Sequence, residues 1–225
     1  MEVDTLMFAI GRIPNVTGMG LEEAGVQYDP DDGIYTNEHL KTSNGDIFSV
    51  GDCLALASNA EEAKTHKGPG FQFTHNSDVQ ARSVVRNALF FGSVDKRTML
   101  VPWSTYTEPE IAHVGKYSWQ LDSVGVPYDT YTKFYQRLDR ALCEGKRGFV
   151  KIHVKKGSDE ILGATAVGGP AGELVCLLTS GMYNGLGLSK IGACVYPYPS
   201  WAEGIKHLAD QYNKKQVGGK SKAVV

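Results

Sequence analysis

Hydrophobic positions near the start of the chain form two short runs and one helical stripe. The apolar runs over residues 5–10 and 46–50 each predict a buried strand. Residues 74–91 carry apolar side chains at helical spacing, which predicts a helix. A strand needs neighbouring strands for its backbone hydrogen bonds, and few are available here. We therefore expect residues 1–92 to be the tail of a larger α/β sheet, and the chain to be part of a longer protein.

The pattern then changes to α+β. Alternating apolar residues over 148–167, with a turn between them, predict an antiparallel hairpin. Apolar stripes at helical spacing predict two helices that begin near Pro170 and Pro199. Residues 93–213 are therefore expected to form a second domain. Residues 214–225 show no periodicity, and we expect a mobile tail there.

The composition is that of an ordinary globular chain. Its 225 residues carry 23 basic and 25 acidic side chains, a net charge of −2, which excludes a strongly basic nucleic-acid binder and a polybasic membrane anchor. No apolar run is long enough to span a membrane. The acidic start, Met1–Asp4, is not typical of a secretory signal. These features favour a cytoplasmic protein.

The cysteines and histidines show no spacing that is typical of a metal or redox site. The four cysteines include no CxxC pair, and the six histidines include no HxxxH or HExxH pattern. We expect no metal site, and we interpret the cysteines as small buried side chains in a reducing compartment.

Two features of the first region are candidate ligand contacts. Gly51 and Asp52 follow a predicted strand, at the end where open α/β sheets bind ligands. An ionised Asp52 would accept hydrogen bonds from a hydroxyl-bearing ligand, but a turn aspartate that bonds its own backbone is an equal alternative. The helix start at Phe73, Thr74 and His75 presents N–H groups and a partial positive charge that can hold an anion. Its simpler interpretation is the start of a surface helix.

Tyr198 and Glu203 are the candidates in the second region. Ser200 and Glu203 fit a capping box, in which the glutamate accepts a hydrogen bond from the backbone N–H of the capping residue. Tyr198 stands just before that cap, where it either offers its hydroxyl to a ligand or packs at an interface.

Five segments in a fixed order carry a resemblance to a known family. The segments are Ala9–Asn15, Thr42–Asp52, Phe73–His75, Pro102–Gly115 and Gly148–Glu173. Together they resemble the C-terminal part of the flavoprotein disulfide reductases, the pyridine nucleotide-disulfide oxidoreductases, over about residues 5–213.

The resemblance implies a fold, two cofactors and a partner. The fold would be an α/β remnant of a FAD/NAD(P)-binding region, followed by an α+β dimerisation domain with an antiparallel sheet. FAD would be held by Gly51, by Asp52 at its ribityl chain, and by the backbone of residues 73–75 at its ring. NAD(P)H would reduce the FAD in the full-length parent. A homodimer is implied, in which Tyr198 and Glu203 line the acceptor side of the partner's flavin site, facing a small-molecule or thiol/disulfide acceptor.

The chain departs from the family pattern in two ways. It has neither the GxGxxG segment nor the redox-active CxxxxC pair, so we predict that it cannot reduce a disulfide by itself. Tyr198 also replaces the histidine acid/base of members that act on dithiols, which makes the segment more similar to mercuric reductase, although the chain lacks the C-terminal Cys-Cys of that enzyme. Two alternatives stay open: a non-catalytic homodimerisation module, and an electron-transfer flavoprotein without a thiol pair.

Overall fold

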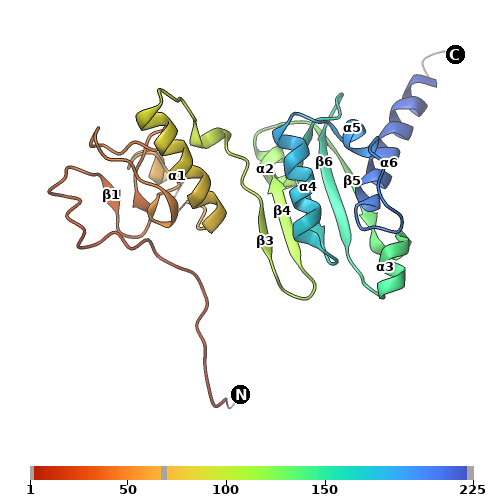
Figure 1. Ribbon diagram of the computed structural model, residues 1–225, viewed down its shortest axis with the longest axis horizontal. Coiled ribbons are helices and arrows are strands. Elements are labelled where there is room, and N and C mark those ends of the chain that lie inside the picture. The colour runs from red at the N-terminus through yellow and green to blue at the C-terminus, as the bar shows by residue number, and fades with distance from the viewer. Residues whose placement is uncertain (1–2, 67–69, 222–225) are drawn as a thin grey trace. The chain divides into compact units, whose positions relative to one another are not determined.

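The chain folds into two compact units. The computed structural model describes residues 3–66 and 70–221, with side chains described as far as residue 217. Unit 1 comprises Met1–Met99 and unit 2 comprises Leu100–Val225 (Figure 1). This division lies a few residues after the boundary expected at residue 92.

Unit 1 contains one long helix and little other regular structure. Its elements are the hairpin of β1 (Tyr28–Asp29) and β2 (Gly33–Ile34), the 3-10 turns η1 (Gly51–Cys53), η2 (Glu62–Lys64) and η3 (Lys96–Thr98), and helix α1 (Thr74–Leu89). Two small clusters form its core: Val16, Leu21, Val26 and Ile34 in one, and Tyr35, Ala55, Ala57 and Ala63 in the other. The loops of unit 1 are therefore held by small local contacts instead of a continuous sheet.

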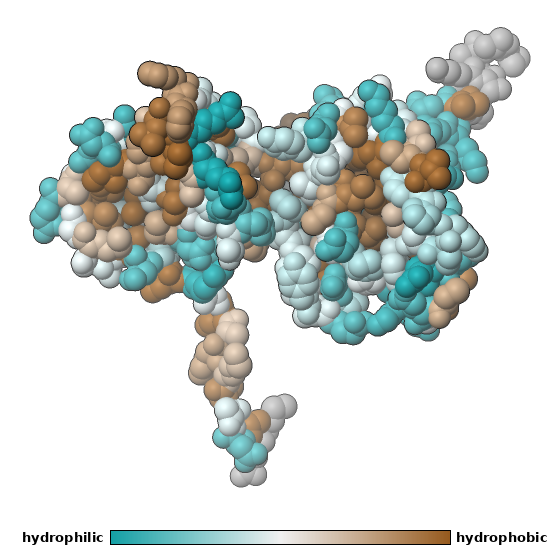
Figure 2. Space-filling model, in the orientation of Figure 1, coloured by the Kyte–Doolittle hydropathy of each residue, from teal (hydrophilic) through white to brown (hydrophobic). Residues whose placement is uncertain are grey.

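The prediction of a strand over residues 5–10 is wrong. This segment is extended but unpaired, and its side chains stand in solvent, with Phe8 76% and Ile10 93% exposed. Figure 2 shows them as brown and pale side chains along the N-terminal segment. The predicted strand over 46–50 is reduced to a single bridge between Lys41 and Phe48. No described strand lies beside residues 5–10, and a lone strand cannot satisfy its own backbone groups.

Helix α1 confirms the helix predicted over 74–91, but it buries a different face from the expected one. Its buried residues are Asn76, Gln80 and Ser83. The apolar positions Val79, Val85 and Leu89 are between 48% and 69% exposed. The polar face is buried because its side chains find hydrogen-bond partners there; for example, the Asn76 amide donates to the Phe71 carbonyl over 3.0 Å.

Unit 2 is built on a five-stranded antiparallel sheet. The strands are β3 (Trp103–Thr105), β4 (Ile111–Gly115), β5 (Tyr128–Phe134), β6 (Phe149–Lys155) and β7 (Ile161–Val167), and their order in the sheet is β3-β4-β7-β6-β5. Strands β6 and β7 confirm the predicted hairpin, and their register pairs Val150 with Ala166 and Ile152 with Ala164. All four of these side chains are fully buried, so one face of the hairpin belongs to the core.

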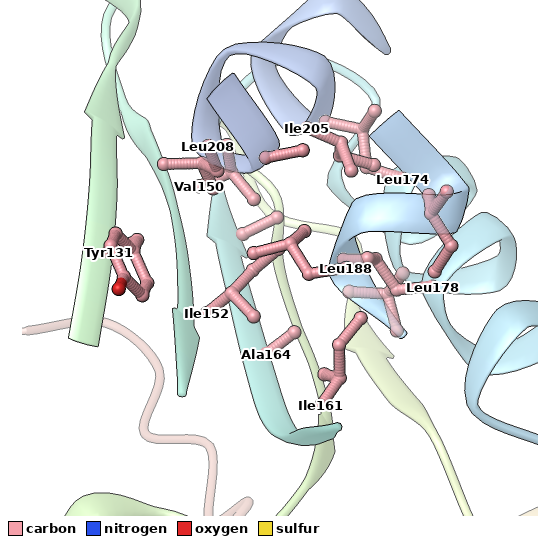
Figure 3. Packing of buried hydrophobic residues seen from close by; sticks show 14 of the residues in the cluster. Tyr131, Val150, Ile152, Ile161, Ala164, Leu174, Leu178, Leu188, Ile205 and Leu208 are labelled. Carbon is pink, nitrogen blue, oxygen red and sulfur yellow. The ribbon is translucent and has the colours of Figure 1, made fainter. Parts of the chain in front are cut away.

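Helices cover that face of the sheet. They are α4 (Ala171–Tyr183), α5 (Leu188–Gly192) and α6 (Glu203–Ser221), while α2 (Ser118–Ser123), the turn η4 (Tyr135–Arg137) and α3 (Asp139–Glu144) lie in the connections between strands. Helix α4 contacts β4 and β7, and α6 contacts β5 and β6. Figure 3 shows Leu174 and Leu178 of α4, and Ile205 and Leu208 of α6, pointing into the core above the sheet.

Helix α6 is longer than the sequence pattern predicts. It runs to Ser221, whereas no periodicity predicts a helix over residues 214–225, which were expected to be a mobile tail; residues 222–225 lie outside the described residues. The Lys215 ammonium donates to Asp129 Oδ1 of β5 over 2.7 Å. The extension has no apolar stripe. Besides this ion pair, the Lys215 ammonium lies over the Tyr131 ring of β5, 5.9 Å from its centroid.

Candidate functional site

The turn at Gly51 packs directly on helix α1. The backbone N–H of Gly51 donates to the Gln80 side-chain carbonyl over 2.7 Å. Gly51 has a positive φ of 80°, and a Cβ atom at this position would lie 2.8 Å from the Ser77 hydroxyl. Only glycine accepts both this backbone conformation and this approach without strain. Residues Gly51 and Asp52 are thereby fixed against the first two turns of α1.

The Asp52 side chain points away from this turn and forms an ion pair with Arg12. Arg12 Nη1 lies 3.3 Å from Asp52 Oδ2, and Arg12 Nη2 donates to the Gln72 carbonyl over 2.7 Å. The Gln72 amide in turn donates to the Asp52 carbonyl over 3.4 Å. The Asp52 side chain is 50% exposed, so the carboxylate is oriented by its neighbours and still accessible to a ligand.

The start of α1 lies beside the same group of residues. The N-cap of α1 is Phe73, and Thr74 is the first residue of the helix. The Phe73 side chain makes no capping hydrogen bond. The rings of Phe73 and His75 stack at 5.3 Å, with Phe71 stacked on Phe73 at 6.2 Å. A helix start of this kind carries a partial positive charge from its backbone dipoles. Since Gln72 precedes the helix and contacts Asp52, the structure brings Asp52 and the helix start together.

The second pair of candidates lies at the start of α6, within unit 2. Glu203 Oε2 accepts from the Ser200 backbone N–H over 3.0 Å, which confirms one half of the predicted capping box. The Ser200 hydroxyl has no partner among the described residues, so the reciprocal half is absent. Tyr198 is 71% exposed, and its hydroxyl donates to Asp139 Oδ2 over 2.6 Å. This hydrogen bond, with the negative charge of that carboxylate, raises the pKa of Tyr198 above its ordinary value.

Three features of the site are not predicted by the sequence patterns. Arg12 lies in a recognisable segment, but nothing in the sequence pairs it with Asp52, 40 positions away. Gln80 sits on a helix face that its polarity marks as solvent-exposed, yet it is buried. Asp139, the first residue of α3, is 59 positions from Tyr198. Each pair is made by tertiary structure and has no local signature.

The interpretation of the cysteines as buried side chains is wrong for most of them. Cys143, Cys176 and Cys194 are exposed, and Cys53 is half-buried, with its thiol 3.2 Å from the Ser49 hydroxyl. None of the four is in a disulfide.

Two family models match the chain. One, described as pyridine nucleotide-disulphide oxidoreductase, matches residues 1–80. The other, described as the dimerisation domain of the same family, matches residues 101–209. The chain belongs to the pyridine nucleotide-disulphide oxidoreductases. Its fold is accordingly a partial FAD/NAD(P)-binding region followed by the dimerisation domain with its antiparallel sheet.

The relatives of this chain are longer proteins. Mitochondrial dihydrolipoyl dehydrogenase of Dictyostelium discoideum is 28% identical over 216 residues, which are 95% of this chain and 41% of the relative. Mercuric reductase of Shigella flexneri is 28% identical over 217 residues, 95% of this chain and 36% of the relative. The chain thus spans about two fifths of the length of these curated relatives.

Two solved structures share the fold of this chain. LpdA of Mycobacterium tuberculosis superposes with a TM-score of 0.77 at 25% identity, over 91% of this chain and 42% of that one. The HOCl-induced flavoprotein disulfide reductase RclA of Escherichia coli, in a Cu(II) complex, gives a TM-score of 0.75 at 23% identity, over 89% and 43%. Among the described residues of this chain, no helix has the length and apolar character needed to cross a membrane.

A buried histidine lies in the sheet of the dimerisation domain. His113 is 2% exposed and stacks on Tyr117, with ring centroids 3.7 Å apart. Its Nδ1 lies 2.9 Å from the Thr165 hydroxyl, and its Nε2 lies 3.1 Å from the Gly115 carbonyl. Burial lowers the pKa of His113 below its ordinary value of 6.5, and the contact with the Gly115 carbonyl offsets this only in part. The folded domain therefore favours the neutral ring.

We expect the dimerisation domain to lose stability as the pH falls below about 6.5. In that range the unfolded chain binds a proton at His113 more readily than the folded chain, so acid favours unfolding. The loss can reach about 1.4 kcal/mol for each unit by which folding lowers the pKa. Urea unfolding at neutral and mildly acidic pH measures it. The H113F variant, which keeps an aromatic ring on Tyr117, should weaken this pH dependence, and an unchanged pH dependence in H113F would contradict the role given to His113.

Proposed function

We propose that this chain is part of a FAD-dependent NAD(P)H oxidoreductase that works as a homodimer. In this proposal residues 1–92 belong to the nucleotide-binding region and residues 93–213 form the dimerisation domain. The observation that carries it is the meeting of the Asp52 turn with the start of α1, joined by Arg12 and Gln72. Membership of the family supports the same chemistry.

The residues of the Asp52 turn fit one side of a flavin site. Asp52 offers a half-exposed carboxylate, which accepts hydrogen bonds from hydroxyl groups such as those of a ribityl chain. Phe73, Thr74 and His75 place a helix start, with its partial positive charge, next to that carboxylate. FAD, when bound, would supply the ring that takes up a hydride. The helix start would favour the negative charge that the ring gains, because its dipoles are already oriented.

Arg12 and Gly51 would prepare this side of the site. Arg12 forms an ion pair with one carboxylate oxygen of Asp52 and donates a hydrogen bond to the Gln72 carbonyl. Gly51 allows the turn to sit close to α1, with its N–H committed to Gln80. Both contacts fix the position of Asp52 before any ligand arrives, which lowers the entropy cost of binding.

Tyr198 and Glu203 would act on the acceptor side of the partner's flavin site. Tyr198 is largely exposed and presents a hydroxyl at the surface of unit 2. Glu203 is committed to the Ser200 N–H, so its part is to fix the start of α6 beside Tyr198. The match of residues 101–209 to the dimerisation-domain model supports the homodimer that this arrangement requires.

The acceptor is the least defined part of the proposal. Cysteines 143, 176 and 194 are spread over the surface of unit 2, and no two of the four cysteines have the CxxxxC spacing. We therefore expect no disulfide reduction by the chain's own thiols. We propose two acceptor types: a disulfide, and a metal ion as in mercuric reductase. Tyr198 favours the metal ion over a dithiol substrate, because tyrosine is a weak base at neutral pH.

The test is to measure flavin and oligomeric state on the purified protein. We expect FAD to bind saturably, as seen by the visible absorbance of oxidised flavin, and the particle mass to be that of a dimer. A dimer that binds no flavin at any concentration would contradict the enzyme proposal and favour a dimerisation module. Flavin binding without a dimer would contradict the role given to Tyr198.

A further inference from the structure

We propose that Asp139 is a positioning residue: it accepts the hydrogen bond of the Tyr198 hydroxyl and keeps Tyr198 protonated, so that Tyr198 does not act as a base on the acceptor side. The proposal rests on the proposed function, because it concerns the residue assigned to the acceptor side. It goes further in identifying Asp139 and in disfavouring one class of substrate.

The geometry places a single carboxylate on the Tyr198 hydroxyl. Asp139 Oδ2 accepts from Tyr198 over 2.6 Å, a distance typical of a hydrogen bond to a charged acceptor. Asp139 is the first residue of α3, and the preceding N-cap residue, Leu138, gives no side-chain hydrogen bond. An acidic side chain in the first turn is favoured by the helix dipole. The position of the carboxylate is thus set by α3 and does not depend on a flexible loop.

The other charged or ionisable groups near Tyr198 act in the same direction. Glu203 of α6 and Cys143 of α3 each raise the pKa of Tyr198, with effects smaller than that of Asp139. Glu203 Oε2 already accepts from the Ser200 N–H. Within the described part of the chain, each group that shifts the pKa of Tyr198 raises it, so these groups favour the protonated hydroxyl over a tyrosinate.

A hydroxyl held in this way restricts the chemistry of the acceptor. A dithiol donates electrons only after it has lost a proton, which needs a base whose pKa lies near neutral pH. Tyr198 cannot serve, since its ordinary pKa is already near 10 and Asp139 raises it. The single proton of the Tyr198 hydroxyl is directed to Asp139, so towards a substrate the hydroxyl presents only oxygen lone pairs. We infer that this position disfavours dithiol donors, which need a base there.

The test is a titration of Tyr198 in the chain, which needs neither flavin nor turnover. The 11 tyrosines would be labelled with carbon-13 at the ring Cζ, and the Tyr198 signal assigned by its loss in Y198F. We expect Tyr198 to ionise at lower pH in D139N than in the wild type, and D139E to restore part of the difference. D129N, which removes an equal charge from the Lys215 ion pair, should leave Tyr198 unchanged.

A second variant covers the case in which D139N disturbs α3. D139E keeps the carboxylate, so its Tyr198 should ionise closer to the wild-type pH than that of D139N. An unchanged Tyr198 titration in folded D139N, or a Tyr198 titration in D139E equal to that in D139N, would overturn the proposal. Neither result depends on flavin, so failure of this proposal and failure of the flavin site are separate outcomes.

Discussion

Replacing Leu208 by alanine is expected to lower the free energy of unfolding of unit 2 by about 2–5 kcal/mol. Leu208 is fully buried on α6 and belongs to the same cluster as Val150 and Ile152 of the sheet (Figure 3). Truncation removes three heavy atoms from contact and leaves a cavity that packed neighbours fill only in part. Since α6 begins at Glu203, a few residues after Tyr198, its packing positions the proposed acceptor side.

Tryptophan fluorescence in urea measures this loss in unit 2 alone. All three tryptophans, at positions 103, 119 and 201, lie in residues 100–225. The control is L142A, the same substitution on α3 at a leucine that is 60% exposed, for which we expect a change within about 0.5 kcal/mol. Equal midpoints for L208A and L142A would show that α6 does not pack on the sheet as described.

The sequence predicts the β6–β7 hairpin and helices α4 and α6 of unit 2 because their local patterns agree with their tertiary contacts. The alternation in the hairpin places Val150 and Ile152 on the buried face, as observed. The apolar stripes of α4 and α6 face the same core. Where a segment buries its own apolar face against a neighbour in the same unit, the period of the pattern predicts that segment. Strands β3, β4 and β5 are not among the predicted elements.

Unit 1 is predicted less well because its patterns and its contacts disagree. The apolar segment over 5–10 has the composition of a buried strand but no neighbouring strand among the described residues. Helix α1 buries Gln80 and exposes Leu89, because the Gly51 turn supplies a hydrogen-bond donor to the polar face. Binary patterning cannot anticipate a polar face that is buried for its hydrogen bonds.

The candidate site is likewise predicted only in part from the sequence. Asp52 and the α1 start can be found from the sequence, since a turn aspartate after a glycine and a helix start each have local signals. Their partners Arg12 and Gln72 cannot be found, because each contact joins distant segments. The same holds for Asp139, which has no pattern that links it to Tyr198.

The central claim is that Asp52 and the start of α1 form one side of a flavin site. Removing the Asp52 carboxylate should therefore weaken FAD binding, because the ligand hydroxyls lose a charged acceptor. A hydrogen bond to a charged group contributes about 1.5–3 kcal/mol, which corresponds to a loss of about 10- to 150-fold in affinity. The D52N variant, which keeps an acceptor oxygen without the charge, should fall between D52A and the wild type.

The direct measurement is an equilibrium titration of FAD into wild-type, D52A and D46A protein, followed by flavin fluorescence. Asp46 is an exposed carboxylate of the same loop, and D46A makes the same change of charge away from the site. We predict that D52A raises the dissociation constant for FAD by about 10-fold or more, while D46A binds like the wild type. Equal affinities for D52A, D46A and the wild type would contradict the flavin site described for this chain.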